Sequence, residues 1–167
     1  MSGARSAVTL AVLGTILAIG AMWGWSEATK PFPGAVEPPT CVDQAIQRGE
    51  KVFPDQVVVT VLNAGNREGL AGRTMGLFVD EGFREGDRGN APARTRVSRA
   101  EIWAADPSSP AVALVASRLG GDTGVVRRRS AGSEVVVVVG DRFTRLTDGR
   151  RFVVARQDTS ICTPPAA

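Results

Sequence analysis

The sequence predicts an α/β fold of the α+β-like kind, with one small mixed sheet, two helices packed on one of its faces, and a preceding transmembrane helix. Three observations support this prediction. Apolar strand patterns alternate with amphipathic helix patterns, in the order strand, helix, strand, helix, strand. Hydrophobic residues make up 43% of the 167 residues, which is enough for one core. An uncharged apolar run lies near the N-terminus.

The first strand and the first helix follow one another directly. Residues 57–62 are apolar apart from one threonine, which is typical of a buried strand. Residues 67–81 then repeat apolar side chains at helical spacing. Asn66 is the expected N-cap, and Gly82 followed by Phe83 predicts a Schellman-type end.

The second strand and helix come after a polar segment. Residues 84–96 hold two glycines and a proline and are expected to form a loop. Residues 97–104 alternate, so the side chains of Glu101 and Trp103 should share one face of a strand. Ser109 and Pro110 are suited to the N-cap and first position of a helix that ends at the glycine pair 120–121.

The C-terminal part predicts three more elements. Residues 125–129 are suited to a short edge strand, and the five valines at 135–139 are best explained by a central strand. Residues 143–146 and 152–155 flank Asp148-Gly149, which is a hairpin turn signal.

The N-terminal region predicts a membrane anchor. Residues 7–25 carry no charge and would span about 28 Å as a helix, close to the thickness of a bilayer core. Arg5 before the run places the N-terminus in the cytoplasm and the rest outside, in a plasma-membrane protein with a single span. The alternative is a cleaved signal peptide, but the run is long and its cleavage site poor.

These signals divide the chain into five parts. Residues 1–6 would be a cytoplasmic stub and 7–25 the anchor. Residues 26–55 would be a proline-rich tether with a short pre-domain segment, in which 41–49 is expected to form a short helix. The folded domain would occupy 56–157, followed by a tail at 158–167 that carries Cys162.

The two cysteines, Cys41 and Cys162, bracket the domain. In an oxidising compartment such a pair indicates a disulfide, and the alternative is two free thiols in flexible tails. Their spacing excludes a catalytic CxxC motif.

Composition excludes several function classes. The chain has no histidine, so it has no Ser-His-Asp or Cys-His catalytic set and none of the common histidine-containing zinc motifs, and we expect no metal and no cofactor. Twenty basic residues against 17 acidic ones give no overall nucleic-acid footprint. The nearest approach to paired carboxylates is Asp80-Glu81, with Asp106 alone elsewhere, and neither forms a general acid–base pair. We therefore do not expect an enzyme.

Two basic groups are candidate sites for an anion or an acidic polymer. Alternation places Arg127 and Arg129 on one strand face and Arg128 on the other. A second group comprises Arg94, Arg96 and Arg99. The alternative for the first group is an edge strand whose charges prevent edge-to-edge pairing.

Trp103 is a candidate interface residue, since an exposed tryptophan beside arginine is common in protein interfaces. The alternative is that the predicted C-terminal hairpin covers it. A third candidate is the turn at 63–69, which precedes a helix as phosphate-binding turns do. Its spacing matches no phosphate motif, so a tight structural turn is the alternative.

Residues 57–143 resemble the LytR C-terminal domain family of actinobacterial envelope proteins. The family opens with V-x-V-x-N-x-(G/T), then G-L-A and an apolar helix ending in G-F, and closes on V-V-V-G-x-x-F. Here the opening includes Asn63, Gly65 and Gly69, the helix ends at Gly82-Phe83, and the close contains Gly140. Asn90 and Glu101-Ile102-Trp103 fall in the segments between. The resemblance gives the glycines and Asn63 a structural role.

The resemblance implies a role in cell-envelope organisation or integrity. The family occurs behind transferase domains that attach glycopolymers to peptidoglycan, and also in small single-span envelope proteins; this chain resembles the second kind. The expected partners are the membrane, through the N-terminal helix, and an envelope protein or wall glycopolymer. The alternative is an accessory subunit or enzyme acting on lipid-linked glycopolymers. A carboxylate such as Asp87 or Asp106 facing Arg94 or Arg127 across a pocket would favour it.

Overall fold

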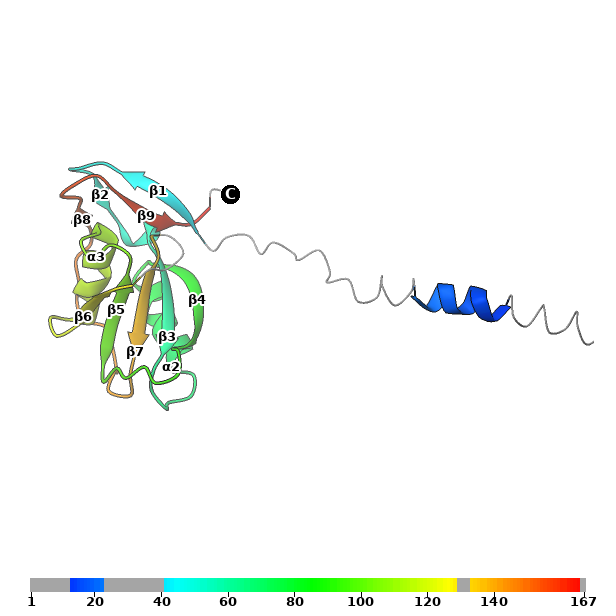
Figure 1. Ribbon diagram of the computed structural model, residues 1–167. Coiled ribbons are helices and arrows are strands. Elements are labelled where there is room, and N and C mark those ends of the chain that lie inside the picture. Colours follow the sequence, from blue (N-terminus) through cyan, green and yellow to red (C-terminus); the bar gives the residue numbers. More distant parts are fainter. Residues whose placement is uncertain (1–12, 23–40, 129–132, 166–167) are drawn as a thin grey trace, which may run out of the picture. The chain divides into compact units, whose positions relative to one another are not determined.

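The computed structural model describes residues 13–22, 41–128 and 133–165, which fall into two compact units, Met1–Pro38 and Pro39–Ala167. In the first unit, residues 13–22 form a helix (Figure 1). The side chains of this helix are exposed. Among the described residues no helix has both the length and the apolarity needed to cross a bilayer. The other residues of the predicted span at 7–25 lie outside the described ranges.

The second unit is built on a five-stranded mixed sheet in the order β4-β3-β7-β5-β6 (Figure 1). The strands are β3 (Val58–Asn63), β4 (Arg84–Asn90), β5 (Ala100–Ala104), β6 (Gly124–Arg127) and β7 (Val135–Val139). β3 runs parallel to both β4 and β7, whereas β5 is antiparallel to β7 and parallel to β6. The predicted central strand of five valines is β7, and all five are buried.

The prediction of a polar loop at 84–96 is wrong for residues 84–90, which form strand β4. Its sequence, REGDRGN, shows no apolar alternation. β4 lies at the edge of the sheet with most side chains exposed, so its pairing rests on backbone hydrogen bonds to β3 and not on buried side chains. The spacing of apolar residues therefore could not predict this strand.

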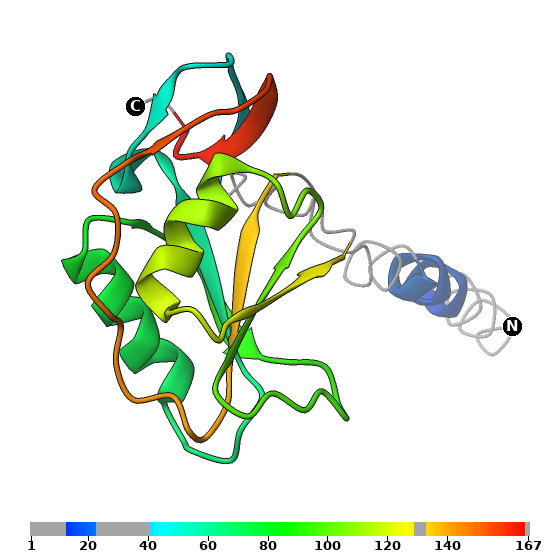
Figure 2. The same ribbon diagram turned by 90° about the vertical axis from the view of Figure 1, so that its left-hand side faces the viewer.

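Two helices cover one face of the sheet, as predicted (Figure 2). They are α2 (Leu70–Asp80) and α3 (Pro110–Leu119). Ser109 and Pro110 occupy the N-cap and first position of α3, as expected. The main core lies between helices and sheet and includes Val59, Val61, Val137 and Ile102 from the strands and Leu70, Met75, Phe78, Val112, Val115 and Leu119 from the helices.

Both ends of α2 are set by glycine. Gly69, at φ 68°, is the N-cap, so the prediction of Asn66 as the cap is wrong. At the other end Gly82, at φ 88°, donates its N–H to Val79, and the Phe83 N–H reaches back to Phe78. These are the two hydrogen bonds of a Schellman motif and confirm the predicted helix end.

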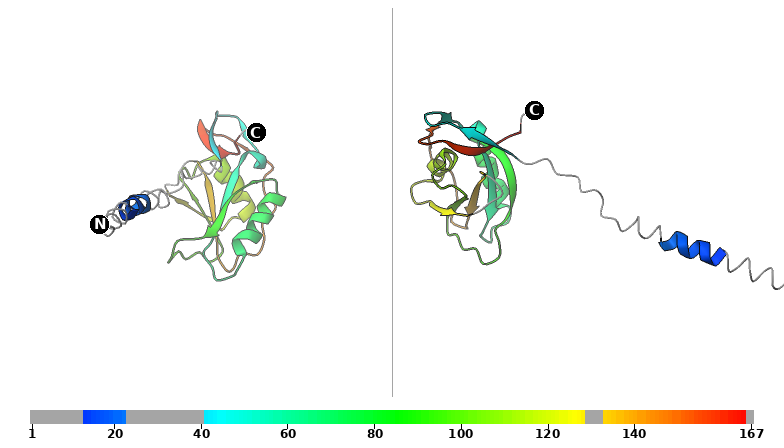
Figure 3. Two further views of the ribbon diagram at one scale, coloured as in Figure 1. Left: turned by 90° about the vertical axis from the view of Figure 1, so that its right-hand side faces the viewer. Right: turned by 45° about the horizontal axis from the view of Figure 1, so that its top comes forward.

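Two short ladders extend the domain beyond the predicted boundaries of 56 and 157. β1 (Val42–Ile46) pairs antiparallel with β9 (Thr159–Thr163), and β2 (Lys51–Val52) pairs antiparallel with β8 (Val153–Val154). The right-hand view of Figure 3 shows the β1–β9 ladder from above. A 3-10 turn, η1 (Pro54–Gln56), joins β2 to β3. The short helix predicted at 41–49 is therefore wrong. The segment 41–55 belongs to the folded domain, and so do Thr159–Thr163, which were assigned to the tail.

The core explains why these end segments are ordered. Ile46, Val52 and Ile161 are fully buried in the same cluster as the helices. Each is a single apolar residue in a short polar segment, which periodicity does not detect. The predicted hairpin around Asp148-Gly149 is also absent, because 143–150 forms no strand and β8 pairs with β2 instead.

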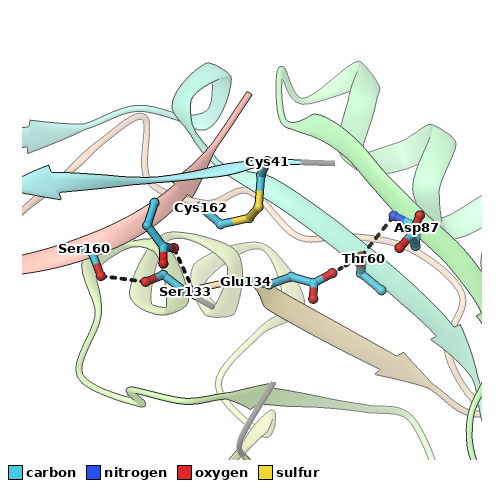
Figure 4. The surroundings of a disulfide bond; sticks show 8 residues. Cys41, Thr60, Asp87, Ser133, Glu134, Ser160 and Cys162 are labelled. Atoms are coloured by element: carbon cyan, nitrogen blue, oxygen red, sulfur yellow. Dashed lines mark hydrogen bonds between the residues drawn. A yellow bond between two sulfur atoms is a disulfide. The ribbon is translucent and has the colours of Figure 1, made fainter. Parts of the chain in front are cut away.

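The Cys41–Cys162 disulfide is formed, with Cα atoms 5.5 Å apart and a sequence separation of 121 residues (Figure 4). It joins the residue before β1 to β9, where Cys162 is buried. Beside it the Ser133 N–H donates to Asp43 Oδ1 at 3.0 Å, and the hydroxyls of Ser133 and Ser160 are 2.6 Å apart. The disulfide and these hydrogen bonds hold the β1–β9 ladder against the start of β7.

One ion pair links the C-terminal ends of the two helices. Arg118 Nη1 of α3 lies 2.5 Å from Glu81 Oε2 at the end of α2, and the Arg118 side chain is 11% exposed. We expect Glu81→Ala to lower the free energy of unfolding by about 1–2 kcal/mol, since a nearly buried guanidinium loses its counter-charge. Chemical denaturation checks this. Glu85→Ala is the control, because its ion pair with Arg88 is well exposed and its loss should cost at most about 0.5 kcal/mol.

Candidate functional site

In the turn between β3 and α2, two backbone N–H groups are already hydrogen-bonded to the side chain of Asp141. Asp141 Oδ1 accepts hydrogen bonds from the backbone N–H of Asn66 at 2.8 Å and of Arg67 at 3.1 Å. Asn63 Oδ1 accepts from the Gly65 N–H at 2.9 Å. The amides that could hold a phosphate therefore already hold a carboxylate, which supports the structural interpretation of this turn.

Trp103 belongs to a cluster on the face of the sheet opposite the helix-covered core. The left-hand view of Figure 3 shows the sheet from the side turned away from Figure 2. Trp103 is 6% exposed, so it is not an exposed anchor, and the predicted covering hairpin does not exist. Its Nε1 donates to Glu101 Oε1, which confirms that these two residues share a face. The guanidinium of Arg128 stacks 3.7 Å from the centre of the Trp103 ring. Trp103 thus belongs to a small second core with Val136 and Val138.

The arginines of the two predicted basic groups lie in different environments. Arg127 is exposed on edge strand β6, which confirms the predicted edge, while Arg129 lies outside the described residues. Arg99 forms an ion pair with Asp122 at 2.9 Å. Arg96 lines a shallow hollow together with Asp141 and Arg142. Arg94 is exposed, at φ 72°.

A groove of about 620 Å³ lies between the start of α3 and strand β8. Its α3 side is formed by Pro107, Ser108, Pro110 and Ala113. Its β8 side is formed by Arg150, Phe152, Val153, Val154, Arg156 and Gln157. Arg150 and Arg156 are exposed, and neither has an ion pair with any residue in the described ranges.

The groove continues onto an exposed apolar surface, the outer face of the β2–β8 ladder. Lys51 lies opposite Val154 in the ladder, and the rings of Phe53 and Phe152 are 5.7 Å apart. Phe53, Phe152 and Val154 are 42%, 39% and 44% exposed. The ammonium of Lys51 lies 4.6 Å from the centre of the Phe152 ring. Large apolar side chains gathered beside unpaired cations are typical of an interaction surface.

Sequence reasoning missed this groove. Its arginines and Phe152 fall in the segment assigned to the hairpin, and its other wall is the start of α3. The available signal was the alternation Arg150, Phe152, Val154, Arg156, which places two cations and two apolar residues on one side of an extended segment.

The carboxylate Asp106 lies just before α3. Its pKa is lowered, chiefly because the Ser108 hydroxyl donates to it at 2.6 Å, and less strongly by the charge of Arg127. The hollow beside it measures about 50 Å³ and is lined mainly by serine and alanine residues, without Arg127. Asp106 therefore does not face Arg127 across a pocket. Within the described ranges, no three acidic or cysteine side chains are grouped to hold a metal ion.

A comparison with family models identifies one family for this chain. The model of the family described as LytR cell envelope-related transcriptional attenuator matches residues 56–143. Among solved structures, the soluble domain of a conserved hypothetical secreted protein from Mycobacterium marinum is similar at 28% identity and a TM-score of 0.49. That match covers 62% of this chain and 79% of the other. No curated protein matches the chain significantly.

Proposed function

The chain belongs to the LytR cell envelope-related transcriptional attenuator family, and from this premise we propose that it is a single-pass envelope protein with an extracytoplasmic, non-enzymatic binding domain. Residues 7–25 would anchor it with the N-terminus in the cytoplasm. The domain would bind an anionic envelope component, either an acidic protein or a wall polymer, and so support envelope organisation.

The groove between α3 and β8 is the observation that carries this proposal. Arg150 and Arg156 line it without an acidic partner among the described residues, and exposed apolar side chains lie between them. Unpaired guanidinium groups bind carboxylates and phosphates through paired hydrogen bonds. A groove of about 620 Å³ has the volume of an ordinary ligand-binding site.

The test is co-sedimentation of the full chain, in a non-ionic detergent, with cell-envelope fragments across a salt series. We expect binding to weaken as salt rises, and Arg150→Ala/Arg156→Ala to weaken it roughly three- to tenfold at low salt, because two exposed charge contacts are lost. The matched control is Arg94→Ala/Arg127→Ala, which removes the same charge from exposed sites away from the groove. Equal loss in both variants would contradict a groove site.

A further inference from the structure

We propose that the groove is a strand-addition site, in which an extended acidic segment of a partner protein pairs with the free edge of β8. This inference rests on the proposed function and names the partner class of the same groove. It follows from three features of β8: its unused backbone groups, the wall that faces them, and the order of its side chains.

The backbone of β8 has one free edge. The Ala155 N–H donates to the Glu50 carbonyl and the Ala155 carbonyl accepts from the Gly49 N–H, both at 2.8 Å. In an antiparallel ladder alternate residues direct both backbone groups to the same side. Val153 therefore faces β2 like Ala155, whereas Phe152 and Val154, which line the groove, direct their N–H and C=O groups away from β2.

Among the described residues, no backbone hydrogen bond joins the opposite wall to this edge. That wall carries Pro107 and Pro110, which have no backbone N–H to offer a strand. Gln157 Nε2 donates to Ser108 Oγ at 3.4 Å and so joins the two walls at residue 157, which leaves residues 150–156 for the partner segment. Backbone donors and acceptors that lie unused along a groove suit a polypeptide in particular, since strand addition satisfies them in a regular ladder. For this reason we favour a protein segment over a glycan.

The side chains of β8 and its flanks define what the partner must carry. Arg150, Phe152, Val154 and Arg156 alternate along the chain, and all four are exposed and line the groove. Ala155, between the last two, is buried. Residues directly opposite each other in paired strands project to the same face. The matching segment therefore has the pattern acidic-x-apolar-x-apolar-x-acidic.

The experiment measures binding of a labelled peptide, Glu-Thr-Val-Thr-Val-Thr-Glu with blocked ends, to the full chain in non-ionic detergent by fluorescence anisotropy. The Lys-for-Glu peptide tests the charge requirement. Two N-methylated peptides test the backbone, one methylated on both valines and the other on two threonines. We expect the parent peptide to bind, the lysine peptide to lose at least about tenfold in affinity, and only one of the two methylated peptides to lose binding, since alternate N–H groups face β8.

The outcomes separate this inference from the proposed function. Equal binding of both methylated peptides and the parent would overturn strand addition, and so would absence of peptide binding by a chain that still sediments with envelope fragments through Arg150 and Arg156. Val154→Pro removes an N–H that does not pair with β2, so it should reduce peptide binding while the unfolding midpoint confirms the fold. If envelope binding survives Arg150→Ala/Arg156→Ala unchanged, the proposed function fails independently of the peptide result.

Discussion

Removing the Cys41–Cys162 disulfide should lower the free energy of unfolding by about 4–5 kcal/mol, measured by chemical denaturation of Cys41→Ala/Cys162→Ala. The reason is the sequence separation of 121 residues, because a cross-link over so long a loop removes much conformational freedom from the unfolded chain. The β1–β9 ladder that it holds has only two strands, which are marginally stable without further support.

Two controls separate this effect from general damage. A reducing agent should destabilise the wild-type chain by the same amount and leave the double variant unchanged. Amide hydrogen exchange should accelerate first in β1 and β9, while the β3–β7 pair keeps its protection. An unfolding midpoint of the wild-type chain that does not respond to reduction would show that the disulfide contributes no stability.

Gly140→Ala is expected to destabilise the domain by about 3 kcal/mol. A methyl group at Gly140 would overlap the carbonyl of Val97 and lie 2.7 Å from the Ser98 carbonyl oxygen. The backbone here cannot simply move aside, because the Gly140 N–H donates to the Arg99 carbonyl at 2.9 Å and the Arg142 N–H donates to Ser98 at 3.0 Å. Overpacking against fixed backbone is among the most costly single substitutions.

Gly121→Ala is the matched control, since a methyl group there meets no atom within 4 Å. We expect it to change the unfolding free energy by less than about 0.5 kcal/mol. Thermal or urea unfolding of both variants would test the comparison, and a Gly140→Ala midpoint equal to that of Gly121→Ala would disprove the close approach. The result would also give Gly140, in the closing motif of the family, a physical explanation.

The parts of the fold that sequence predicts are those with local signals. The apolar repeat within α2 and the five valines of β7 identify buried elements from their own residues. β4 and β9 depend on partners instead. β4 pairs with β3 across α2, and β9 pairs with a strand near the opposite end of the domain. No pattern within seven or fewer mostly polar residues indicates those partners.

The same distinction, between features with a local signal and features that depend on a distant partner, applies to the candidate site. The disulfide was predicted because the two cysteines bracket the domain in a compartment expected to be oxidising, and it is formed. The groove was not predicted, since it exists only when β8 pairs with β2 and so turns Arg150 and Arg156 toward α3. Trp103 was misassigned for a related reason. The predicted face of the strand was correct. The residue that covers the ring is Arg128, which directly follows β6, so the stacking depends on the pairing of β5 with β6.

The position of the disulfide also sets the route by which mechanical load would cross the domain. A pull on the chain before residue 41 enters at Cys41, and the covalent bond transfers it to Cys162. From there the chain leads back through the short segment between β9 and β8 to the groove. Tension between that end of the chain and a partner held on β8 would therefore have a covalent route through the disulfide and the short β8–β9 segment, one that does not run along the strands of the five-stranded sheet.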